Sequence, residues 1–404
     1  MRVQDMAETP MGTKTISKDV HWVGVKHYNR RLFDGLIPLP HGTSYNAYLV
    51  VGKEKTALID TVNPGFEKVL VDKISQHADP TKLDYIVMNH AEPDHANSVK
   101  TMLDMSPNAK LLAGAKGKEA AMMYFGVPAE RIMVVDESTR IDLGGRTLRF
   151  IDAPWLHWPE TIFTYLEEEG ILFPCDFFGS HIACGAFFSD EFGDDLAVDM
   201  AKLYFAEIMM PFRKPGANAV EKVKKLGVKM IAPSHGVIWR NPEVILEPYT
   251  RWTGEKMAKK VAIVYVSMWG STEKMVRTLW EALVKKGVDV QIFDIPETDV
   301  GHIAKELVDT PIVVVGAPTV LGGVHPVAAY ATMLVKQLRA PTKYAAVLSS
   351  YGWSGGAVKA ISELIAGTKI EVLDAIDVKG PPKKEDLDRV LALADKIEAK
   401  LSAF

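Results

Sequence analysis

The chain has 404 residues, with 47 basic and 51 acidic side chains and a formal net charge of -4. This length exceeds what one hydrophobic core usually supports, so we expect at least two domains. The nearly balanced charge, without a basic run interleaved with aromatic residues, argues against nucleic acid as a partner. No apolar stretch reaches the ~18 residues that cross a bilayer, and the first residues do not resemble a signal peptide. We therefore expect a cytoplasmic protein that does not associate with membranes.

The cysteine content is low. Cys175 and Cys184 are the only cysteines, and they form no C-x-x-C pair. The sequence therefore predicts neither a disulfide framework nor a cysteine-ligated iron site.

The first half of the chain alternates between short apolar segments and amphipathic ones. Strands are predicted at residues 47–51, 56–60, 85–88, 110–113, 132–135, 147–152, 161–165 and 171–173. Helices are predicted near residues 66–77, 98–105 and 116–125. Strands with interspersed helices predict an α/β fold in which two sheets are covered on the outside by helices.

A dense cluster of potential metal ligands follows the strand at residues 85–88. His90, Glu92, Asp94 and His95 occupy four of six consecutive positions. On an extended chain we expect the first three to project to one side, while His95 points elsewhere and can serve a second ion. A solvated polar turn is the alternative for any one of them, but the group as a unit favours a metal site. Two imidazoles with two carboxylates suit iron, manganese or zinc, and the carboxylates favour a redox metal.

Three further candidate ligands lie at predicted strand ends, each near a proline or glycine: His157, Asp176 and His235. A single histidine in such a place is more often a hydrogen-bonded structural residue. Together with the first cluster, however, these residues provide about the number of ligands that a two-metal site requires.

A second domain is predicted after a polar segment at residues 252–260, which gives domains of residues 1–256 and 257–404. A buried strand at residues 261–266 runs into Ser267, Met268, Trp269, Gly270, Ser271 and Thr272, and a helix follows. Hydroxyl groups and a helix N-terminus together favour a bound phosphate. Because neither G-x-x-x-x-G-K nor G-x-G-x-x-G is present, flavin mononucleotide (FMN) fits better than a nucleoside triphosphate or a dinucleotide.

Two later loops support this prediction, because they follow strands expected at residues 312–315 and 345–349. Loops at the carboxyl ends of neighbouring parallel strands can enclose the phosphate, ribityl chain and ring of FMN. Ordinary turns with packed aromatic residues are the alternative. The predicted FMN-binding residues of these loops are Pro318, Thr319, Val320, Leu321, Gly322, Ser350, Tyr351, Gly352, Trp353, Ser354, Gly355 and Gly356. A strand at residues 370–378 and an amphipathic helix at 384–401 complete the domain.

Five sequence signatures together resemble the flavodiiron protein family over nearly the whole chain. They are H-x-E-x-D-H, L-H-W-P, the aspartate after Cys175, P-S-H-G-V-I-W-R and S-M-W-G-S-T-E-K-M, in the family's order. The resemblance implies an N-terminal metallo-β-lactamase-like αββα sandwich followed by a flavodoxin-like doubly wound parallel sheet. Hydrolases of the first fold carry H-x-H-x-D-H, and Glu92 in place of their second histidine favours iron over a zinc pair.

The resemblance also implies a role for each candidate ligand of a diiron centre. One iron is assigned to His90, Glu92 and His157, the other to Asp94, His95 and His235, and Asp176 bridges them. Three further residues are weaker candidates for orienting ligands or donating protons, with plain packing as the alternative: His27, His181 and Tyr204.

The family reduces dioxygen to water or nitric oxide to nitrous oxide. The loop at residues 319–325 departs from the asparagine-containing version of rubredoxin-coupled members, and the chain looks most like the methanogen subgroup that oxidises reduced coenzyme F420. The resemblance thus implies a dioxygen-reducing oxidase with FMN and two irons, assembled as a head-to-tail homodimer or a dimer of dimers. The alternatives are a rubredoxin-dependent nitric oxide reductase, a dizinc hydrolase with a flavin-binding regulatory module, and a non-catalytic electron carrier.

Overall fold

The computed structural model describes residues 12–404, and its contacts divide the chain into two compact units that meet between Thr253 and Gly254. Each unit has its own sheet system and its own hydrophobic core. Among the described residues, every helix is too short or too polar to span a bilayer.

The first unit contains a seven-stranded mixed sheet. Its strands, in spatial order, are β1 (Lys14–Ser17), β2 (Val20–Trp22), β7 (Tyr48–Val51), β8 (Thr56–Ile59), β9 (Tyr85–Val87), β10 (Lys110–Ala113) and β11 (Ile132–Val134). Strands β8 to β11 are parallel, and the others pair antiparallel. Two two-stranded sheets, of β3 (Val25–His27) with β6 (Thr43–Tyr45) and of β4 (Leu32–Phe33) with β5 (Ile37–Pro38), are separate from this sheet.

A five-stranded sheet packs against the first and forms the inner core of the sandwich. It consists of β12 (Arg140–Asp142), β13 (Thr147–Asp152), β14 (Ile162–Leu166), β15 (Ile171–Phe173) and β16 (Met230–Ile231). Val87 of β9 and Phe150 of β13 belong to the core between the sheets, whereas Ile86 belongs to the core beneath the outer helices. Successive residues of a strand point to opposite faces, so an apolar run such as β9 is buried on both sides.

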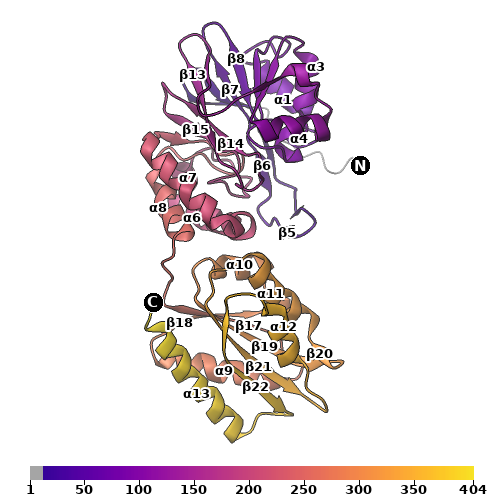
Figure 1. The fold of residues 1–404 in the computed structure, drawn as a ribbon, viewed down its shortest axis with the longest axis vertical. Helices are drawn as coiled ribbons and strands as arrows, with labels where there is room; N and C mark the ends of the chain where they lie inside the picture. The colour runs from indigo at the N-terminus through magenta and orange to yellow at the C-terminus, as the bar shows by residue number, and fades with distance from the viewer. Residues whose placement is uncertain (1–11) are drawn as a thin grey trace. The chain divides into compact units, whose positions relative to one another are not determined.

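Helices cover both outer faces, as the sequence predicted (Figure 1). The seven-stranded sheet carries α1 (Glu67–Ile74), α3 (Val99–Met105) and α4 (Ala115–Phe125), and the helices on the other side are α6 (Asp194–Tyr204), α7 (Arg213–Leu226) and α8 (Glu243–Thr253). Aromatic contacts from Phe163 of β14 through Phe177 to Tyr249 fix α8 to the outer face of the second sheet. The predicted polar linker at residues 252–260 begins too early, because α8 continues through Thr253 and Trp252 packs on Phe205.

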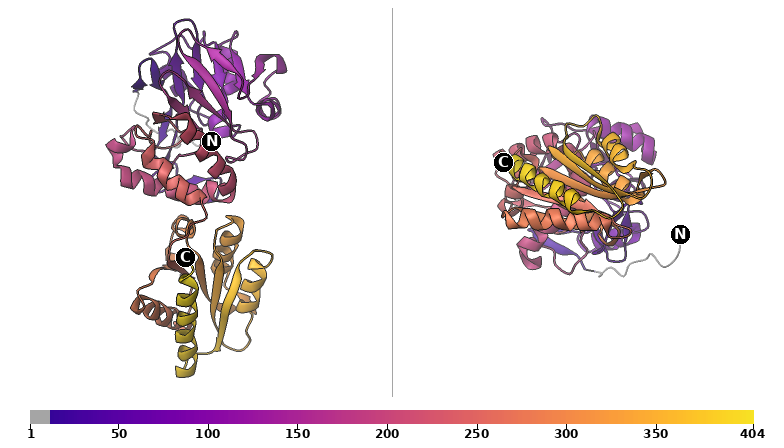
Figure 2. Two further views of the ribbon diagram at one scale, coloured as in Figure 1. Left: turned by 60° about the vertical axis from the view of Figure 1, so that its left-hand side comes forward. Right: turned by 90° about the horizontal axis from the view of Figure 1, so that it is seen from below.

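The second unit is a parallel sheet with helices on both faces (Figures 1 and 2). Its strand order is β18 (Asp289–Asp294), β17 (Lys260–Tyr265), β19 (Ile312–Val320), β21 (Tyr344–Tyr351) and β22 (Glu371–Lys379), with β20 (Gly323–Val324) in a hairpin on β19. One face carries α9 (Ser271–Lys285) and α13 (Lys384–Leu401), and the other carries α10 (Val300–Leu307), α11 (Pro326–Gln337) and α12 (Ala357–Ile365). This order, with β17 between β18 and β19, is the flavodoxin-like topology. The predicted fold class is therefore confirmed for both units.

Candidate metal centre and cofactor cavity

The predicted ligand cluster leaves β9 as an extended chain and then turns into a short helix. Glu92 is the last extended residue, with φ -65° and ψ 139°, and α2 (Pro93–Ala96) begins with a proline at its first position. Proline fits this position because its fixed φ suits a helix and its missing N–H is not needed there. The prediction that His90, Glu92 and Asp94 project to one side is therefore wrong. The helical turn separates Asp94 and His95 from Glu92.

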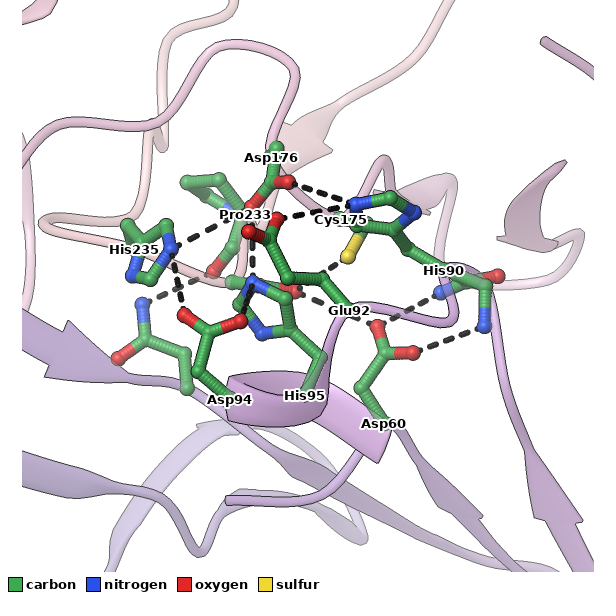
Figure 3. Close-up of polar contacts among 12 residues, drawn as sticks. Asp60, His90, Glu92, Asp94, His95, Cys175, Asp176, Pro233 and His235 are labelled. Carbon is green, nitrogen blue, oxygen red and sulfur yellow. Dashed lines mark hydrogen bonds and ion pairs between the residues drawn. The ribbon is translucent and has the colours of Figure 1, made fainter. Parts of the chain in front are cut away.

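Two groups of ligands face the two oxygens of the Asp176 carboxylate, and Figure 3 labels their members other than His157. His90 and His157 lie 3.4 and 3.3 Å from Asp176 Oδ2, measured from their Nε2 atoms. His95 and His235 lie 2.9 and 3.4 Å from Asp176 Oδ1. The first group is completed by Glu92, whose Oε2 is 2.9 Å from His157 Nε2. The second is completed by Asp94, whose Oδ2 is 3.3 Å from His235 Nε2.

The ligand atoms of each group converge, and several of them lack a hydrogen-bond partner, although Glu92 bonds to His157 within the first group. Within each group, one ligand atom per residue lies within 4.8 Å of the others, so each group could hold a metal ion. Both carboxylate oxygens of Asp94 and of Asp176, and both ring nitrogens of His95, are buried and lack an aligned hydrogen-bond partner. Buried polar atoms are normally paired, and a shared cation satisfies such a set. The residues present therefore fit a two-metal centre.

Two ligand histidines have fixed tautomers. His90 Nδ1 lies 2.8 Å from Glu160 Oε1, and His235 Nδ1 lies 2.6 Å from the carbonyl oxygen of Ser44. Because a carboxylate and a carbonyl only accept, each Nδ1 carries a hydrogen, and each Nε2 is the nitrogen that faces the metal space. Sequence reasoning missed both partners. Glu160, three residues after His157, could have been noticed, whereas a backbone carbonyl leaves no sequence signal.

The electrostatics of the centre favour added positive charge. Burial opposes charge on His90, but the carboxylates of Glu160 and Glu92 outweigh it and raise the pKa of His90 to about 9. Burial acts against ionisation of Asp176 as well, yet His95 and the other imidazoles hold the pKa of this carboxyl well below its usual range. Without a metal, a proton held by His90 balances the negative charge of the carboxylates. A metal ion can replace that proton and supply the positive charge instead.

Behind the ligands, Asp60 connects several segments that precede them. Its Oδ1 accepts from the backbone N–H of Asn89 at 2.9 Å, and its Oδ2 accepts from the Asn89 amide at 2.9 Å and from the Ser234 hydroxyl at 3.3 Å. Ser234 also contacts the sulfur of Cys175 at 3.3 Å. Burial raises the pKa of the Cys175 thiol, which therefore stays protonated beside the ligand Asp176. Asn89, Ser234 and Cys175 each directly precede a predicted ligand, so Asp60 supports two ligand-bearing loops directly and a third through Ser234.

The three weaker candidates lie at different depths around His235. The His181 ring is centred 4.8 Å from that of His235, and its Nδ1 lies 2.9 Å from the Thr43 hydroxyl. Burial, together with neighbouring His235, lowers the pKa of His181 well below its ordinary value. Tyr204 is buried with its ring 5.7 Å from His235. His27 packs on Phe66 and contacts the Tyr45 hydroxyl, and so lies outside this contact layer.

The second unit has a cavity of about 380 Å³ at the carboxyl ends of β17, β19 and β21, where the predicted FMN loops lie. It is lined by Ser267, Met268, Trp269, Ser271, Pro318, Thr319, Ser350, Tyr351, Gly352, Trp353, Gly380 and Pro381. The N-terminus of α9, which begins at Ser271, opens into this region and favours a phosphate. Sequence reasoning missed Gly380 and Pro381, which follow β22 without a recognisable signature.

Not every predicted FMN-binding residue lines the cavity. Thr272 is buried and its hydroxyl lies 2.9 Å from that of Ser350, so it joins two loops. The others outside the lining are Gly270, Val320, Leu321, Gly322, Ser354, Gly355 and Gly356. Gly356 does not line the cavity but allows two of its loops to pack together, because a Cβ there would lie 2.1 Å from the oxygen of Gly322. Only glycine allows the hairpin of β19 and β20 to pack this closely on the loop before α12.

Known proteins resemble the chain over almost its full length. Residues 43–236 match the family described as ODP family beta lactamase, and residues 263–392 match the flavodoxin family. The chain is 38% identical to a nitric oxide reductase of Moorella thermoacetica over 393 residues, which are 96% of this chain and 98% of the relative. It is 34% identical to a coenzyme F420H(2) oxidase of Methanothermobacter marburgensis over 399 residues, again 96% and 98% of the two chains.

A solved structure also resembles the chain over almost its full length. The flavodiiron protein of Giardia intestinalis matches with a TM-score of 0.92 and 30% identity, covering 97% of each chain. These relatives favour the redox prediction over the dizinc hydrolase. The convergent histidine and carboxylate groups and the cavity of the flavodoxin-like unit fit the same cofactors. The chain therefore belongs to the flavodiiron protein family and is an oxidoreductase with FMN and a diiron site.

Proposed function

We propose that the protein is an oxidase that transfers electrons from reduced coenzyme F420 through FMN to the diiron site, where dioxygen is reduced to water. The diiron part of this proposal rests on Asp176, because its two carboxylate oxygens face two separate groups of ligands. When bound, FMN accepts electron pairs from a hydride donor, and the two irons supply electrons to the gas.

The proposed ligands of the first iron are His90, Glu92 and His157, those of the second are Asp94, His95 and His235, and Asp176 contacts both. The carboxylate-rich set supports iron, since hard oxygen donors next to imidazole suit this metal. Glu160 and the Ser44 carbonyl hold Nδ1 of His90 and of His235, and so would keep the Nε2 atoms of both rings available to bind iron. Buried Tyr204, whose ring packs on the half-buried His181, limits water on the side of His235.

The FMN cavity supports a planar donor. Trp269 and Trp353, which line it, are 90% and 86% exposed, and Leu321 of the neighbouring hairpin is 97% exposed. Exposed apolar side chains at a cavity mark a binding surface, and indole rings stack well on flat heterocycles. A deazaflavin such as reduced coenzyme F420 fits this chemistry, and the similarity to a coenzyme F420H(2) oxidase supports the same donor.

A rubredoxin-dependent nitric oxide reductase is the second candidate, because the relative at 38% identity is named a nitric oxide reductase. Rates of consumption of dioxygen and of nitric oxide, measured on one preparation with one donor, distinguish the two. A higher kcat/KM for nitric oxide would reverse the proposed preference.

Stopped-flow mixing with reduced coenzyme F420 tests the donor. We expect the flavin absorbance to bleach within the turnover time, and dioxygen to restore it. Asp176→Asn is the matched control, because it keeps the size of the side chain but weakens a contact shared by both irons. This variant should still accept electrons at FMN and lose most of its iron and its dioxygen consumption. A flavin that stays oxidised rules out this donor, and full activity in the variant rules out the proposed diiron site.

We further propose a head-to-tail homodimer in which the FMN of one chain serves the irons of its partner. Co-expression of a chain carrying Asp176→Asn with a chain carrying Gly356→Ala tests this arrangement. Mixed dimers should be more active than either variant alone, because they combine one intact iron site with one intact FMN site across the interface. A monomer in sedimentation, or mixed chains without recovered activity, would contradict the proposal.

A further inference from the structure

One buried side chain, Asn46, holds the loop of residues 233–236 that carries His235. Its amide nitrogen donates to the carbonyl oxygens of Pro233 at 2.9 Å and Gly236 at 3.0 Å, one on each side of the histidine. Its backbone N–H donates to the carbonyl of Ser234 at 2.7 Å. Three bonds from a single residue therefore fix the backbone path around His235.

The orientation of the Asn46 amide is itself fixed. The indole N–H of Trp22 donates to Asn46 Oδ1 at 2.8 Å, so the amide oxygen faces Trp22 and both amide hydrogens face the loop. Asn46 is only 1% exposed and Trp22 only 2%. An asparagine side chain has two donors and one carbonyl acceptor, and here each of these groups is used. Water cannot readily replace these bonds in such a buried place.

The neighbouring residue Ser44 adds two bonds to the same loop. Its hydroxyl accepts from the N–H of Gly236 at 2.7 Å, and its carbonyl oxygen lies 2.6 Å from His235 Nδ1. The close approach of Gly236 to Ser180 also leaves the loop of residues 233–236 little room to take up a different path that would replace a lost bond. Gly236 has φ of +78°, and a Cβ there would lie 2.1 Å from the Ser180 hydroxyl oxygen.

Asn46 does not support the first ligand group. His90 is held by Glu160, and Asn89 before it is held by Asp60, which reaches the loop of His235 as well, through Ser234. Within residues 12–404, the Asn46 side chain bonds to Trp22, Pro233 and Gly236 and to no residue of the first ligand group. A change at position 46 should therefore affect one metal position and leave the other largely intact.

We propose that Asn46 is a positioning residue for the second iron, acting through the loop of His235. This inference rests on the proposed assignment of His235 as a ligand of that iron. Residues that orient metal ligands typically contribute about 10- to 100-fold to metal affinity. Loss of the two amide donors should therefore weaken retention of one iron per chain by about that factor.

Iron release from the intact, reduced holoprotein tests the proposal. An excess of ferrozine under anaerobic conditions captures ferrous iron, and the absorbance of the complex reports its release with time. In Asn46→Asp, oxygen replaces the amide nitrogen opposite two carbonyl oxygens. We expect one of the two irons to leave about 10- to 100-fold faster than in wild type, and the other to leave within about threefold of its wild-type rate. An EPR spectrum of the half-reduced protein should lose the coupled two-iron signal in step with the fast phase.

Matched variants separate positioning from general stability. Ser106→Ala removes the polar group of another fully buried residue in the same unit. The Ser106 hydroxyl donates to the Pro80 carbonyl at 2.7 Å, away from the ligand loops. It should lower the thermal midpoint without changing the release of either iron. Ser44→Ala removes only the acceptor for Gly236 N–H, and should accelerate the same iron several-fold. It decides the question if Asn46→Asp does not fold.

Each result has a definite meaning. Equal acceleration of both irons in Asn46→Asp would show a merely structural role and overturn the inference, as would release at wild-type rates. His235→Asn, measured in parallel, tests the assignment on which the inference rests. If His235→Asn loses one iron while Asn46→Asp and Ser44→Ala do not, only the role of Asn46 fails. If His235→Asn keeps both irons tightly, the ligand assignment fails and the inference with it.

Discussion

Replacing Glu160 by glutamine removes a negative charge from behind the ligand His90 without changing the shape of the side chain. In the structure, Glu160 Oε1 accepts from His90 Nδ1 at 2.8 Å and from the backbone N–H of Ala91 at 2.9 Å. Burial raises the pKa of Glu160, but the bond to His90 more than compensates and leaves the pKa below its usual range. The wild-type side chain is therefore a carboxylate, and glutamine can keep both bonds through its carbonyl oxygen.

The expected size of the effect follows from the loss of charge. Hydrogen bonds to charged groups contribute about 1.5–3 kcal/mol and neutral ones about 0.5–1.5 kcal/mol, so Glu160→Gln should lose about 1–1.5 kcal/mol. This corresponds to about tenfold weaker retention of the iron bound by His90. Glu160→Ala also leaves two buried donors without an acceptor, at a cost of about 1–3 kcal/mol each, and should lose that iron more completely.

Ferrozine capture from the reduced holoprotein measures this effect as well, and the order of the variants is the test. We expect wild type to release the iron near His90 most slowly, Glu160→Gln about tenfold faster and Glu160→Ala faster still. Glu169→Gln is the control, since Glu169 lies beyond the other end of β14 and is bonded to Arg146. Unchanged release in both Glu160 variants would refute the reasoning, and so would an equal effect of Glu169→Gln.

Two further predictions concern a loop of the FMN cavity and a buried amine. Gly356→Ala would place a Cβ 2.1 Å from the oxygen and 2.8 Å from the carbonyl carbon of Gly322. Because both atoms are backbone, the hairpin must move, and FMN affinity in a fluorescence titration should fall at least about tenfold. Gly323→Ala is the control, because a Cβ there would be 3.9 Å from its nearest neighbour, the oxygen of Val320, and it should bind FMN as wild type does. Burial, together with nearby Lys26, lowers the pKa of Lys73 from 10.5 to about 7. Between these values the unfolded chain binds more protons, so the free energy of unfolding should rise by about 2 kcal/mol from pH 7 to pH 9 relative to Lys73→Met.

These two results would contradict the predictions in different ways. Equal FMN affinity in the two glycine variants would mean that the hairpin and the loop before α12 can separate without cost. Parallel pH profiles for wild type and Lys73→Met, in denaturant unfolding of the first unit, would mean that the amine is charged throughout this range.

The local sequence predicted much of the fold because its signals act over short distances. The strand of residues 110–113, the strand of residues 147–152 and the helix of residues 384–401 have the predicted bounds. The apolar run before His90 predicted a strand buried on both faces, and Val87 and Ile86 do point into two different cores. The helices from residue 189 to residue 253 were not predicted, since no capping or turn signal was recognised there.

By itself, the sequence determined which side chains carry the chemistry: the imidazoles, carboxylates and hydroxyl-rich loops are identifiable by type and spacing. The family resemblance implied how they divide, and the tertiary structure shows the physical reason, because Pro93 starts a helical turn that moves Asp94 and His95 away from Glu92. It also decided which residues hold them, since Glu160, Asn46 and Asp60 reach the ligand loops across 29 to 190 positions of the chain. Hydrogen bonds between segments so far apart depend on the packing of two sheets, and no local pattern encodes them.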